Sequence, residues 1–214
     1  IDLHTSIEYI PFERRNYVAE ILSKNIREKF KPRYSKNEAI VLYSSGTTGK
    51  SKGIILSHYA INTNADAIID YMNPSTSDCM VIVKTISHSS TLTGELLVAL
   101  KSKMNLVISP TIVPPRYILN NIEKFCVSIL CVNPTLLSII SDEISRANYI
   151  LKTLRTIYVS GSILSDTVYE KAHATFYNIP IYNVYGLSEA SPRVTAQRKE
   201  CCKSNSVGKP IKNV

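Results

Sequence analysis

The spacing of apolar residues switches repeatedly between two periods, most clearly between residues 39 and 184. Short runs rich in β-branched and aromatic residues predict strands over residues 39–43, 53–56, 78–84, 105–108, 127–132, 155–159 and 179–184. Between several of these runs, apolar residues recur every three or four positions, which is typical of amphipathic helices. Strands that alternate with helices indicate an α/β fold, with a layered, mainly parallel sheet flanked by helices.

Proline-containing pairs are expected to mark helix limits. Asn73-Pro74 ends one helix, whereas Pro114-Pro115 and Asn133-Pro134 begin two others. A further helix is expected to turn Leu92, Leu96 and Leu100 towards the core. Residues 127–132 (VSILCV) are apolar on both faces of the expected strand, which predicts a strand in the interior of the sheet.

Three segments are expected along the chain. Residues 1–38 predict a basic helical lead-in, residues 39–189 an α/β core that holds the site, and residues 190–214 the start of a following β-rich segment, which is incomplete. The first residue is Ile1 rather than Met, so we expect the chain to be an excerpt from a longer protein.

Composition and cysteine usage exclude several classes of protein. With 214 residues, of which 44% are hydrophobic, the chain is expected to form a real core rather than to stay disordered. No apolar run reaches the roughly 18–20 residues that span a bilayer, and no signal-peptide pattern opens the chain. The cysteines form no CxxC pair, so neither a zinc site nor a disulfide framework is expected, and a cytoplasmic location fits. Cys79, Cys126 and Cys131 are expected to be small buried side chains.

The formal charge of +8 raises the hypothesis of a basic nucleic-acid-binding protein. Residues 193–214 hold much of this excess, and residues 14–36 form a second basic stretch that is mixed with glutamates. Aromatic residues are not interleaved with either stretch, and no nucleic-acid-binding motif is present. Nucleic acid therefore stays a remote alternative, and anionic small substrates are the better match for this charge.

The strongest local signal is a hydroxyl- and glycine-rich loop over residues 43–53 (YSSGTTGKSKG). Glycines let backbone N–H groups converge on an anion, hydroxyl groups add donors, and lysine adds charge, so the loop is suited to phosphate. A Walker A loop is one interpretation, but Ser44 occupies its first glycine position. A strand rather than a helix is also expected after the loop, which disfavours that interpretation.

The alternative interpretation is a loop between two strands, which resembles the phosphate loop of the adenylate-forming superfamily, the acyl-CoA synthetases and their relatives. Three further segments resemble motifs of that family in the same order. They are residues 160–162 (SGS), 183–189 (NVYGLSE) and 206–210 (SVGKP). The resemblance covers about two-thirds of the chain and implies the central part of the family's large N-terminal domain.

The resemblance implies a reaction in which a carboxylate attacks the α-phosphate of ATP, which yields an acyl-adenylate and pyrophosphate. A thiol, from CoA or a carrier protein, then takes the acyl group. The residues that the resemblance assigns to the β- and γ-phosphates are Ser44, Ser45, Gly46, Thr47, Thr48, Gly49 and Lys52. Those assigned to the adenine and the α-phosphate are Gly161, Ser162, Asn183, Tyr185, Gly186 and Ser188. Lys52 and Ser188 are also expected to act in catalysis, as is Glu189, which is expected to bind Mg²⁺ through a hard oxygen ligand.

His88 falls where acyl- and aryl-CoA ligases often carry a histidine near the acyl site, and it is the fourth residue expected to act in catalysis. Relatives that activate amino acids keep an aspartate in this neighbourhood, but residues 79–94 contain no acidic side chain. The resemblance therefore favours a fatty or aromatic carboxylic acid as the substrate.

Two departures and two absences bear on activity. Ser51 replaces the usual proline and Ser188 the commoner threonine of the motifs, and both changes keep or add a hydroxyl group. Beyond residue 190 there is no match to the family's ribose-binding aspartate or to its C-terminal catalytic lysine. A truncated, non-catalytic nucleotide-binding remnant is therefore the alternative to an acid–thiol ligase.

Overall fold

The computed structural model describes residues 37–44, 52–110, 112–147, 149–199 and 203–214. Its strands are β1 (Glu38–Ser44), β2 (Lys52–Ser57), β3 (Cys79–Ile82), β4 (Asn105–Ile108), β5 (Ile129–Val132), β6 (Thr156–Val159), β7 (Ile181–Gly186), β8 (Arg193–Ala196) and β9 (Lys209–Pro210). Its helices are α2 (His58–Met72), α3 (Ser89–Thr91), the π-helical η2 (Leu92–Leu97), α4 (Val98–Ser102), α5 (Pro115–Lys124), α6 (Pro134–Arg146), α7 (Asp166–Thr175) and the 3-10 helix η3 (Ser188–Ala190). The predicted helix within residues 1–38 lies almost wholly outside the described residues.

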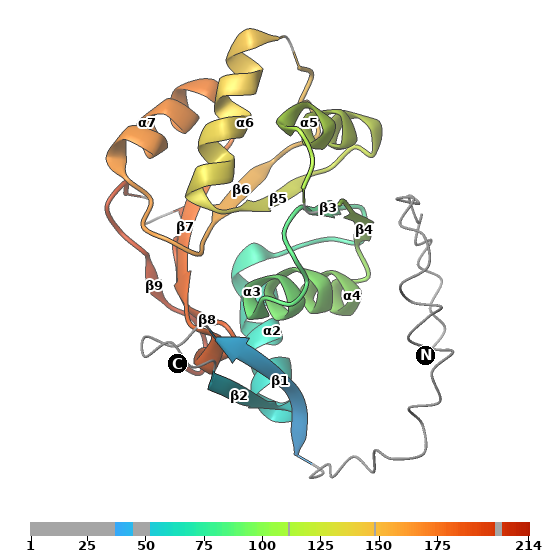
Figure 1. Cartoon of the computed structure of the whole chain (residues 1–214), viewed down its shortest axis with the longest axis vertical. Coiled ribbons are helices and arrows are strands. Elements are labelled where there is room, and N and C mark those ends of the chain that lie inside the picture. The colour runs from blue at the N-terminus through green and yellow to red at the C-terminus, as the bar shows by residue number, and fades with distance from the viewer. Residues whose placement is uncertain (1–36, 45–51, 111, 148, 200–202) are drawn as a thin grey trace.

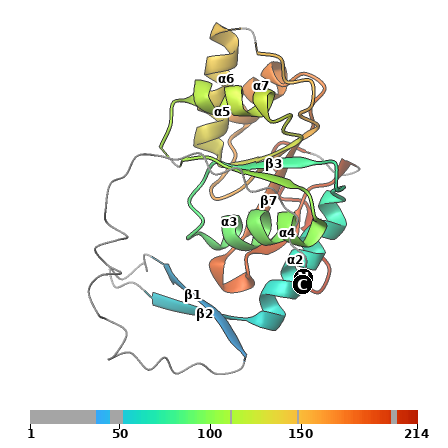
Figure 2. The same cartoon turned by 90° about the vertical axis from the view of Figure 1, so that its right-hand side faces the viewer.

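A seven-stranded sheet with the order β4-β3-β5-β6-β7-β8-β9 forms the centre of the fold. The first five strands in this order are parallel, whereas β8 and β9 extend the sheet in antiparallel pairing. The strands β1 and β2 form a separate antiparallel hairpin, which stands away from the sheet beside the start of α2 (Figure 2). The α/β fold with a mainly parallel sheet is confirmed.

Helices cover both faces of the sheet, with α5, α6 and α7 on one face and α2, α3 and α4 on the other (Figure 1). Side chains of β5 alternate between the two cores. Leu130 and Val132 pack with α5 and α6, whereas Ile129 and Cys131 pack with α2 and α4. The strand is thus buried on both faces, as its apolar run predicts for a parallel strand under helices.

The predicted helix limits are confirmed by their backbone geometry. Asn73 adopts the left-handed conformation (φ 44°) directly after α2, and its N–H bonds to the carbonyl of Ile69. The Asn133 side chain accepts a hydrogen bond of 2.7 Å from the N–H of Leu136, which caps α6. Pro115 opens α5.

The prediction that Leu92, Leu96 and Leu100 face the core from the helix after β3 is wrong. Leu100 is exposed, and the buried positions are instead taken by residues that include Thr91, Thr93 and Glu95. The π-helical turn η2 explains the difference, because its wider turn rotates the following residues relative to a regular α-helix. Leu92 packs against the small core of the β1–β2 hairpin instead of the sheet.

The cysteines divide into two groups. Cys79 and Cys131 are buried as predicted, and burial raises the pKa of their thiols to about 11 and about 12. The expectation for Cys126 is wrong, because this residue is exposed. It occupies a left-handed turn (φ 52°) just after α5, where the chain reverses towards β5 and the side chain points away from the core.

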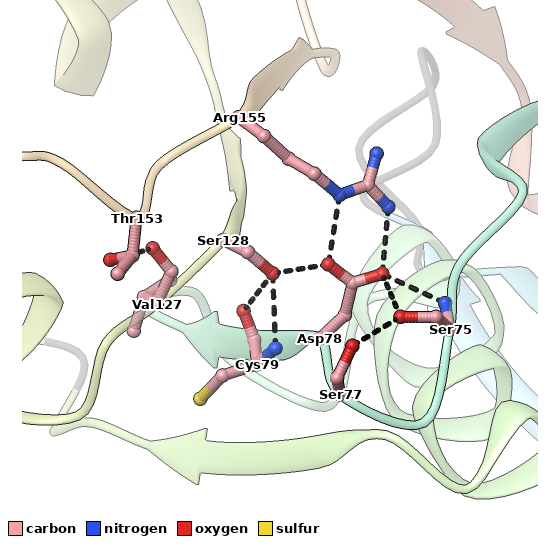
Figure 3. A network of polar contacts seen from close by, with 8 residues as sticks. All are labelled: Ser75, Ser77, Asp78, Cys79, Val127, Ser128, Thr153 and Arg155. Atoms are coloured by element: carbon pink, nitrogen blue, oxygen red, sulfur yellow. Dashed lines mark hydrogen bonds and ion pairs between the residues drawn. The ribbon is translucent and has the colours of Figure 1, made fainter.

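One buried carboxylate joins the amino ends of β3, β5 and β6 (Figure 3). Asp78 accepts two hydrogen bonds of 2.8 Å from the guanidinium of Arg155 and one of 2.6 Å from the hydroxyl of Ser128. The N–H of Ser75 adds a further bond of 2.8 Å. Arg155 is the largest of the causes that hold the pKa of Asp78 well below its usual range.

Within the described part of the chain, no helix combines the length and the apolar character that crossing a membrane requires.

Candidate functional site

The candidate site lies at the carboxyl edge of the parallel sheet. The chain leaves β3 towards β4 on one side and later returns to β5 on the other side, so the connections diverge between β3 and β5. In open α/β sheets, ligands bind in the crevice that such a switch point creates. Two cavities open at this edge and are lined by the residues that follow β3, β5, β6 and β7.

The larger cavity, of about 680 Å³, collects the residues that the sequence assigns to adenine. Gly161 and Ser162 from the turn after β6 form one part of its wall. Asn183, Tyr185 and Gly186 from β7 form another. Tyr185 is 44% exposed, so its ring is available to a planar ligand.

Two glycines shape this wall by backbone constraints. Gly161 has a φ of 99°, a conformation that side-chain-bearing residues rarely adopt. At Gly186, an added Cβ would lie 2.0 Å from the carbonyl oxygen of Pro192. Only glycine allows β7 to approach the segment before β8 this closely.

Asn183 connects two of the sequence motifs. Its side-chain N–H group donates a bond of 3.0 Å to the carbonyl of Ser206, and its backbone N–H donates one of 2.7 Å to the side chain of Gln197. Gln197 also donates to the carbonyl of Ser206, at 2.9 Å. Ser206, in the motif at 206–210, and Gln197 therefore hold Asn183, in the motif at 183–189, in position. Gln197 is a positioning residue that the sequence did not reveal.

The smaller cavity, of about 360 Å³, contains His88 and Ser188 in its wall. His88 is exposed and lies directly before α3. The hydroxyl of Ser89 donates a hydrogen bond of 3.3 Å to the hydroxyl of Ser188, which joins α3 to η3. The structure thus places the predicted acyl-side histidine and the predicted α-phosphate serine around one cavity.

Asn64, in α2, fixes the segment that carries Ser188 and Glu189. Its side-chain N–H group donates to the carbonyls of Ala190 (3.0 Å) and Arg193 (2.8 Å), and its side-chain oxygen accepts from the N–H of Arg193 (3.0 Å). Asn64 is 6% exposed and lies on the apolar face of α2 between Ile61 and Ile68. A polar residue at a core position is the signal that could have found it.

Glu189 is exposed on η3 and belongs to the lining of neither cavity. Its carboxylate has no ion-pair partner among the described residues. Those residues also contain no group of three or more side chains suited to a metal ion. A single carboxylate fits Mg²⁺, which keeps several waters and is commonly bound by one or two carboxylates together with substrate phosphates.

The β1–β2 hairpin presents the ends of the predicted phosphate loop. Ser44 and Lys52 pair at the end of the hairpin where the loop joins the two strands, and β2 lies beside η3. The loop residues Ser45, Gly46, Thr47, Thr48 and Gly49 lie outside the described residues. The structure therefore brings β2, which begins at the end of this loop, close to the segment that carries Ser188 and Glu189.

A buried charge cluster, absent from the sequence predictions, lies behind the smaller cavity. Lys84 and Glu95 form an ion pair of 2.7 Å, and Arg193 also acts electrostatically on Glu95. Burial raises the pKa of Glu95, and both cations oppose this rise. We refer to Lys84, Glu95 and Arg193 as the buried charge cluster.

The fold and the two cavities are typical of α/β proteins that bind a ligand at the carboxyl edge of the sheet. The sequence model of the AMP-binding enzyme family matches residues 6–214. The chain therefore belongs to the AMP-binding enzyme family.

Similar proteins agree with this assignment. A 4-coumarate–CoA ligase from Vanilla planifolia is 28% identical over 183 residues, which cover 82% of this chain and 32% of the ligase. The N-terminal domain of FACL13 from Mycobacterium tuberculosis superimposes with a TM-score of 0.75 at 19% identity, over 91% of this chain and 49% of that domain. The o-succinylbenzoate CoA synthetase of Bacillus subtilis, solved with ATP and magnesium ion, has a TM-score of 0.70 at 22% identity, over 80% of this chain and 35% of the synthetase. The chain spans about one third of the length of the 4-coumarate–CoA ligases of Vanilla planifolia and Dictyostelium discoideum that it matches.

Proposed function

We propose that this chain forms the nucleotide- and acid-binding part of an ATP- and Mg²⁺-dependent acid–thiol ligase. One observation carries the proposal. The two cavities share Gly161, Ser162, Gly186 and Leu187 in their walls. A nucleotide in the larger cavity and a carboxylic acid in the smaller one would therefore meet at this shared wall.

The first step joins the acid to AMP. A carboxylate oxygen attacks the α-phosphorus of ATP, the bond to the bridging oxygen breaks, and pyrophosphate leaves. Holding the two reactants in line supplies a large part of the acceleration in such a step. Ser188 in the wall of the smaller cavity is positioned by Ser89 and would hydrogen-bond the α-phosphate.

The adenine would lie in the larger cavity against Tyr185, with Gly161 and Ser162 on its other side. The donor and acceptor pattern of Asn183 supports this arrangement. Its side-chain N–H group is directed to Ser206, so its side-chain oxygen can accept from the exocyclic amine of adenine.

The polyphosphate would lie between η3 and the hairpin. Ser44, Lys52 and the loop between them would surround the β- and γ-phosphates, which the position of β2 beside η3 supports. Glu189 would hold Mg²⁺ together with phosphate oxygens, and the ion would neutralise charge on the leaving pyrophosphate.

The second step transfers the acyl group from AMP to a thiol. The thiolate attacks the acyl carbon and AMP leaves with the bonding electrons. The similarity to 4-coumarate–CoA ligases favours CoA as the thiol acceptor of this chain, and a carrier-protein thiol is the alternative.

His88 lies in the wall of the smaller cavity, where the acid would bind, and is proposed to contact the acid. The absence of acidic residues from 79–94 supports an acid without an α-ammonium group, of which fatty and aromatic acids are the types that the family resemblance favours.

Calorimetric titration of the chain with Mg·ATP tests the nucleotide part of the proposal. We expect binding in the wild type and at least about tenfold weaker binding in Lys52→Ala and Glu189→Gln, because each change removes one charge-assisted contact. Lys152→Ala and Glu170→Gln are matched controls at exposed positions away from both cavities, and they should bind as the wild type does. Equal affinity in all five proteins would contradict the assigned roles.

Isotope exchange between pyrophosphate and ATP, measured on the native gene product isolated from its own cells, then separates the two candidate functions. Exchange that depends on added carboxylic acid would support the ligase. Mg·ATP binding without any acid-dependent exchange would favour a nucleotide-binding remnant.

A further inference from the structure

Arg193 is a buried cation whose hydrogen bonding is incomplete. Its residue exposure is 4%, and its Nε atom has no hydrogen-bond partner among the described residues. One of its guanidinium nitrogens lies 3.4 Å from the position of a Cβ at Gly94, so the side chain points towards η2. Arginine stays charged at all ordinary pH values, and a buried charge is costly unless other groups compensate it.

The groups inside the fold that face the Arg193 guanidinium are the hydroxyl of Tyr71 and the carboxylate of Glu95, and they compensate its charge only in part. Glu95 is the carboxylate of the buried charge cluster, and its Oε1 atom already pairs with Lys84 at 2.7 Å. Its other oxygen, Oε2, has no hydrogen-bond partner among the described residues, although Arg193 acts on it electrostatically. One carboxylate thus faces two cations, and the cluster keeps an excess of positive charge.

This excess charge faces the smaller cavity. Lys84, His88 and Arg193 are all in the lining, whereas Glu95 is not. None of the described residues that line the cavity is acidic. The charged side chains of the described lining are therefore cationic, and an anion that enters would supply a partner for them.

The cations lie outside the wall that the two cavities share. That wall consists of Gly161, Ser162, Gly186 and Leu187, and the reacting carboxylate must lie beside it to reach a nucleotide. Lys84 and Arg193 belong to the smaller cavity alone. A group that binds them is therefore a different part of the acid from the carboxylate that reacts.

We propose that the acid is short and carries a second anionic group at its far end, which Arg193 binds. This inference rests on the proposed ligase function and names its substrate class, a dicarboxylic or similarly doubly anionic acid. Guanidinium and carboxylate groups match in geometry, and such charge-assisted pairs are strong when water is excluded. Asn64 holds both backbone polar groups of Arg193, so the cation is positioned before the acid arrives.

A long alkyl chain fits this cavity poorly. Serines 89, 90, 160 and 188 and Asn133 join the cations in the lining. Sites for apolar ligands are lined mainly by hydrophobic and aromatic side chains. An alkyl chain would also remove water from Arg193 without replacing its hydrogen bonds, which opposes binding. Of the acids compatible with the family, the cavity favours a compact doubly charged one over a fatty acid.

Succinate and butyrate form a matched pair for the test, because they have the same number of carbons and differ in the second carboxylate. Both are titrated calorimetrically into the wild-type chain with Mg²⁺ and α,β-methylene-ATP, which blocks adenylation. We expect succinate to bind at least about tenfold more tightly. Equal binding, or tighter binding of butyrate, would overturn the inference.

Arg193→Met tests the assigned residue, since methionine keeps an unbranched side chain and removes the charge. We expect the preference for succinate to disappear, because succinate should bind more weakly, and Arg193→Lys should keep part of the preference. Arg146→Met is the control at an exposed position of α6. Circular dichroism would show whether Arg193→Met folds. If it does not fold, Arg193→Lys and the wild-type comparison still test whether Arg193 binds the second anionic group. An unchanged preference in either folded variant would refute the role of Arg193.

The titrations are repeated without nucleotide, so that failure of the proposed ligase function can be distinguished from failure of the inferred substrate class. Loss of nucleotide binding with a retained preference for succinate would count against the proposed ligase and support the anionic cavity. Nucleotide binding without any preference for succinate would leave the ligase standing and overturn this inference.

Discussion

The two ends of the parallel strands place buried charge in opposite ways. At the amino ends of β3, β5 and β6, Asp78 is surrounded by donors from Ser75, Ser128 and Arg155, and the network closes within the fold. At the carboxyl ends, Arg193 is buried with an unpartnered Nε, and the lining of the smaller cavity is cationic. Satisfied polar groups join strands to one another, whereas unsatisfied ones at a cavity are available to a ligand. The first arrangement stabilises the sheet and the second is suited to function.

Removal of the Asp78 carboxylate should produce the largest loss of stability. Asp78→Ala leaves Ser128 and the half-exposed Arg155 without their partner, and we expect the free energy of unfolding to fall by about 2–4 kcal/mol. Urea denaturation followed by circular dichroism measures the change. Asp66→Ala is the control, because Asp66 pairs with Lys101 at an exposed position, and it should cost less than about 1 kcal/mol. Similar losses in both variants would show that the amino-end network is no stronger than a surface ion pair.

Lowering the pH should reduce the free energy of unfolding through the same network. The folded-state pKa of Asp78 lies below its unfolded value of about 4, so the ionised carboxylate stabilises the fold above that pH. The contribution is lost progressively as the pH falls below about 4 towards the folded-state pKa. Urea midpoints at pH 5 and pH 3 should therefore differ more in the wild type than in Asp78→Asn. An equal difference in both proteins would assign the acid sensitivity to other groups.

Loss of Asn64 should affect stability and ligand binding together. Asn64→Ala leaves backbone groups of Ala190 and Arg193 unsatisfied, with an expected cost of about 1–3 kcal/mol. Because the segment carries Ser188 and Glu189, Mg·ATP should also bind several-fold more weakly at a temperature where both proteins are folded. Asn62→Ala, at an exposed position of the same helix, should change neither quantity. Weakened stability with unchanged nucleotide affinity would restrict Asn64 to a structural role.

Gly161 should give the smallest change in stability. Gly161→Ala forces a side chain into a left-handed conformation (φ 99°), and we expect a cost of about 1 kcal/mol and weaker nucleotide binding. Asn178→Ala is the matched control, since it also places alanine at a positive φ (68°) but lies outside both cavities. A nucleotide affinity that is the same in both variants would argue against Gly161 as part of the adenine wall.

Local signals made most of the fold predictable from the sequence. The αL conformation of Asn73, the cap at Asn133 and the two-sided burial of β5 all follow from residues adjacent in the chain. The π-helical turn η2 did not, and two of its residues, Leu92 and Leu97, pack against the small core of the β1–β2 hairpin, which is distant in the sequence. The expectation that Leu100 faces the core failed for this reason.

The residues of the candidate site also divide into those that the sequence could predict and those that it could not. Gly161, Tyr185 and Ser188 could be predicted as site residues because they belong to contiguous motifs, and they line adjoining cavities in the structure. Asn64 and Arg193 were missed, because their partners lie far away in the sequence. The polar residue at a core position of α2 is a signal for Asn64, but nothing adjacent to it indicates which segment it contacts.

The sequence by itself determined the alternation of strands and helices, their caps and the order of the motifs, since periodicity and capping act within a few residues. Only the tertiary structure decided which cations share a cavity and which carboxylate lies behind them. Charge excess at a site is a property of groups gathered from several strands. Lys84, Glu95 and Arg193 become one cluster only when the sheet and α2 place them together.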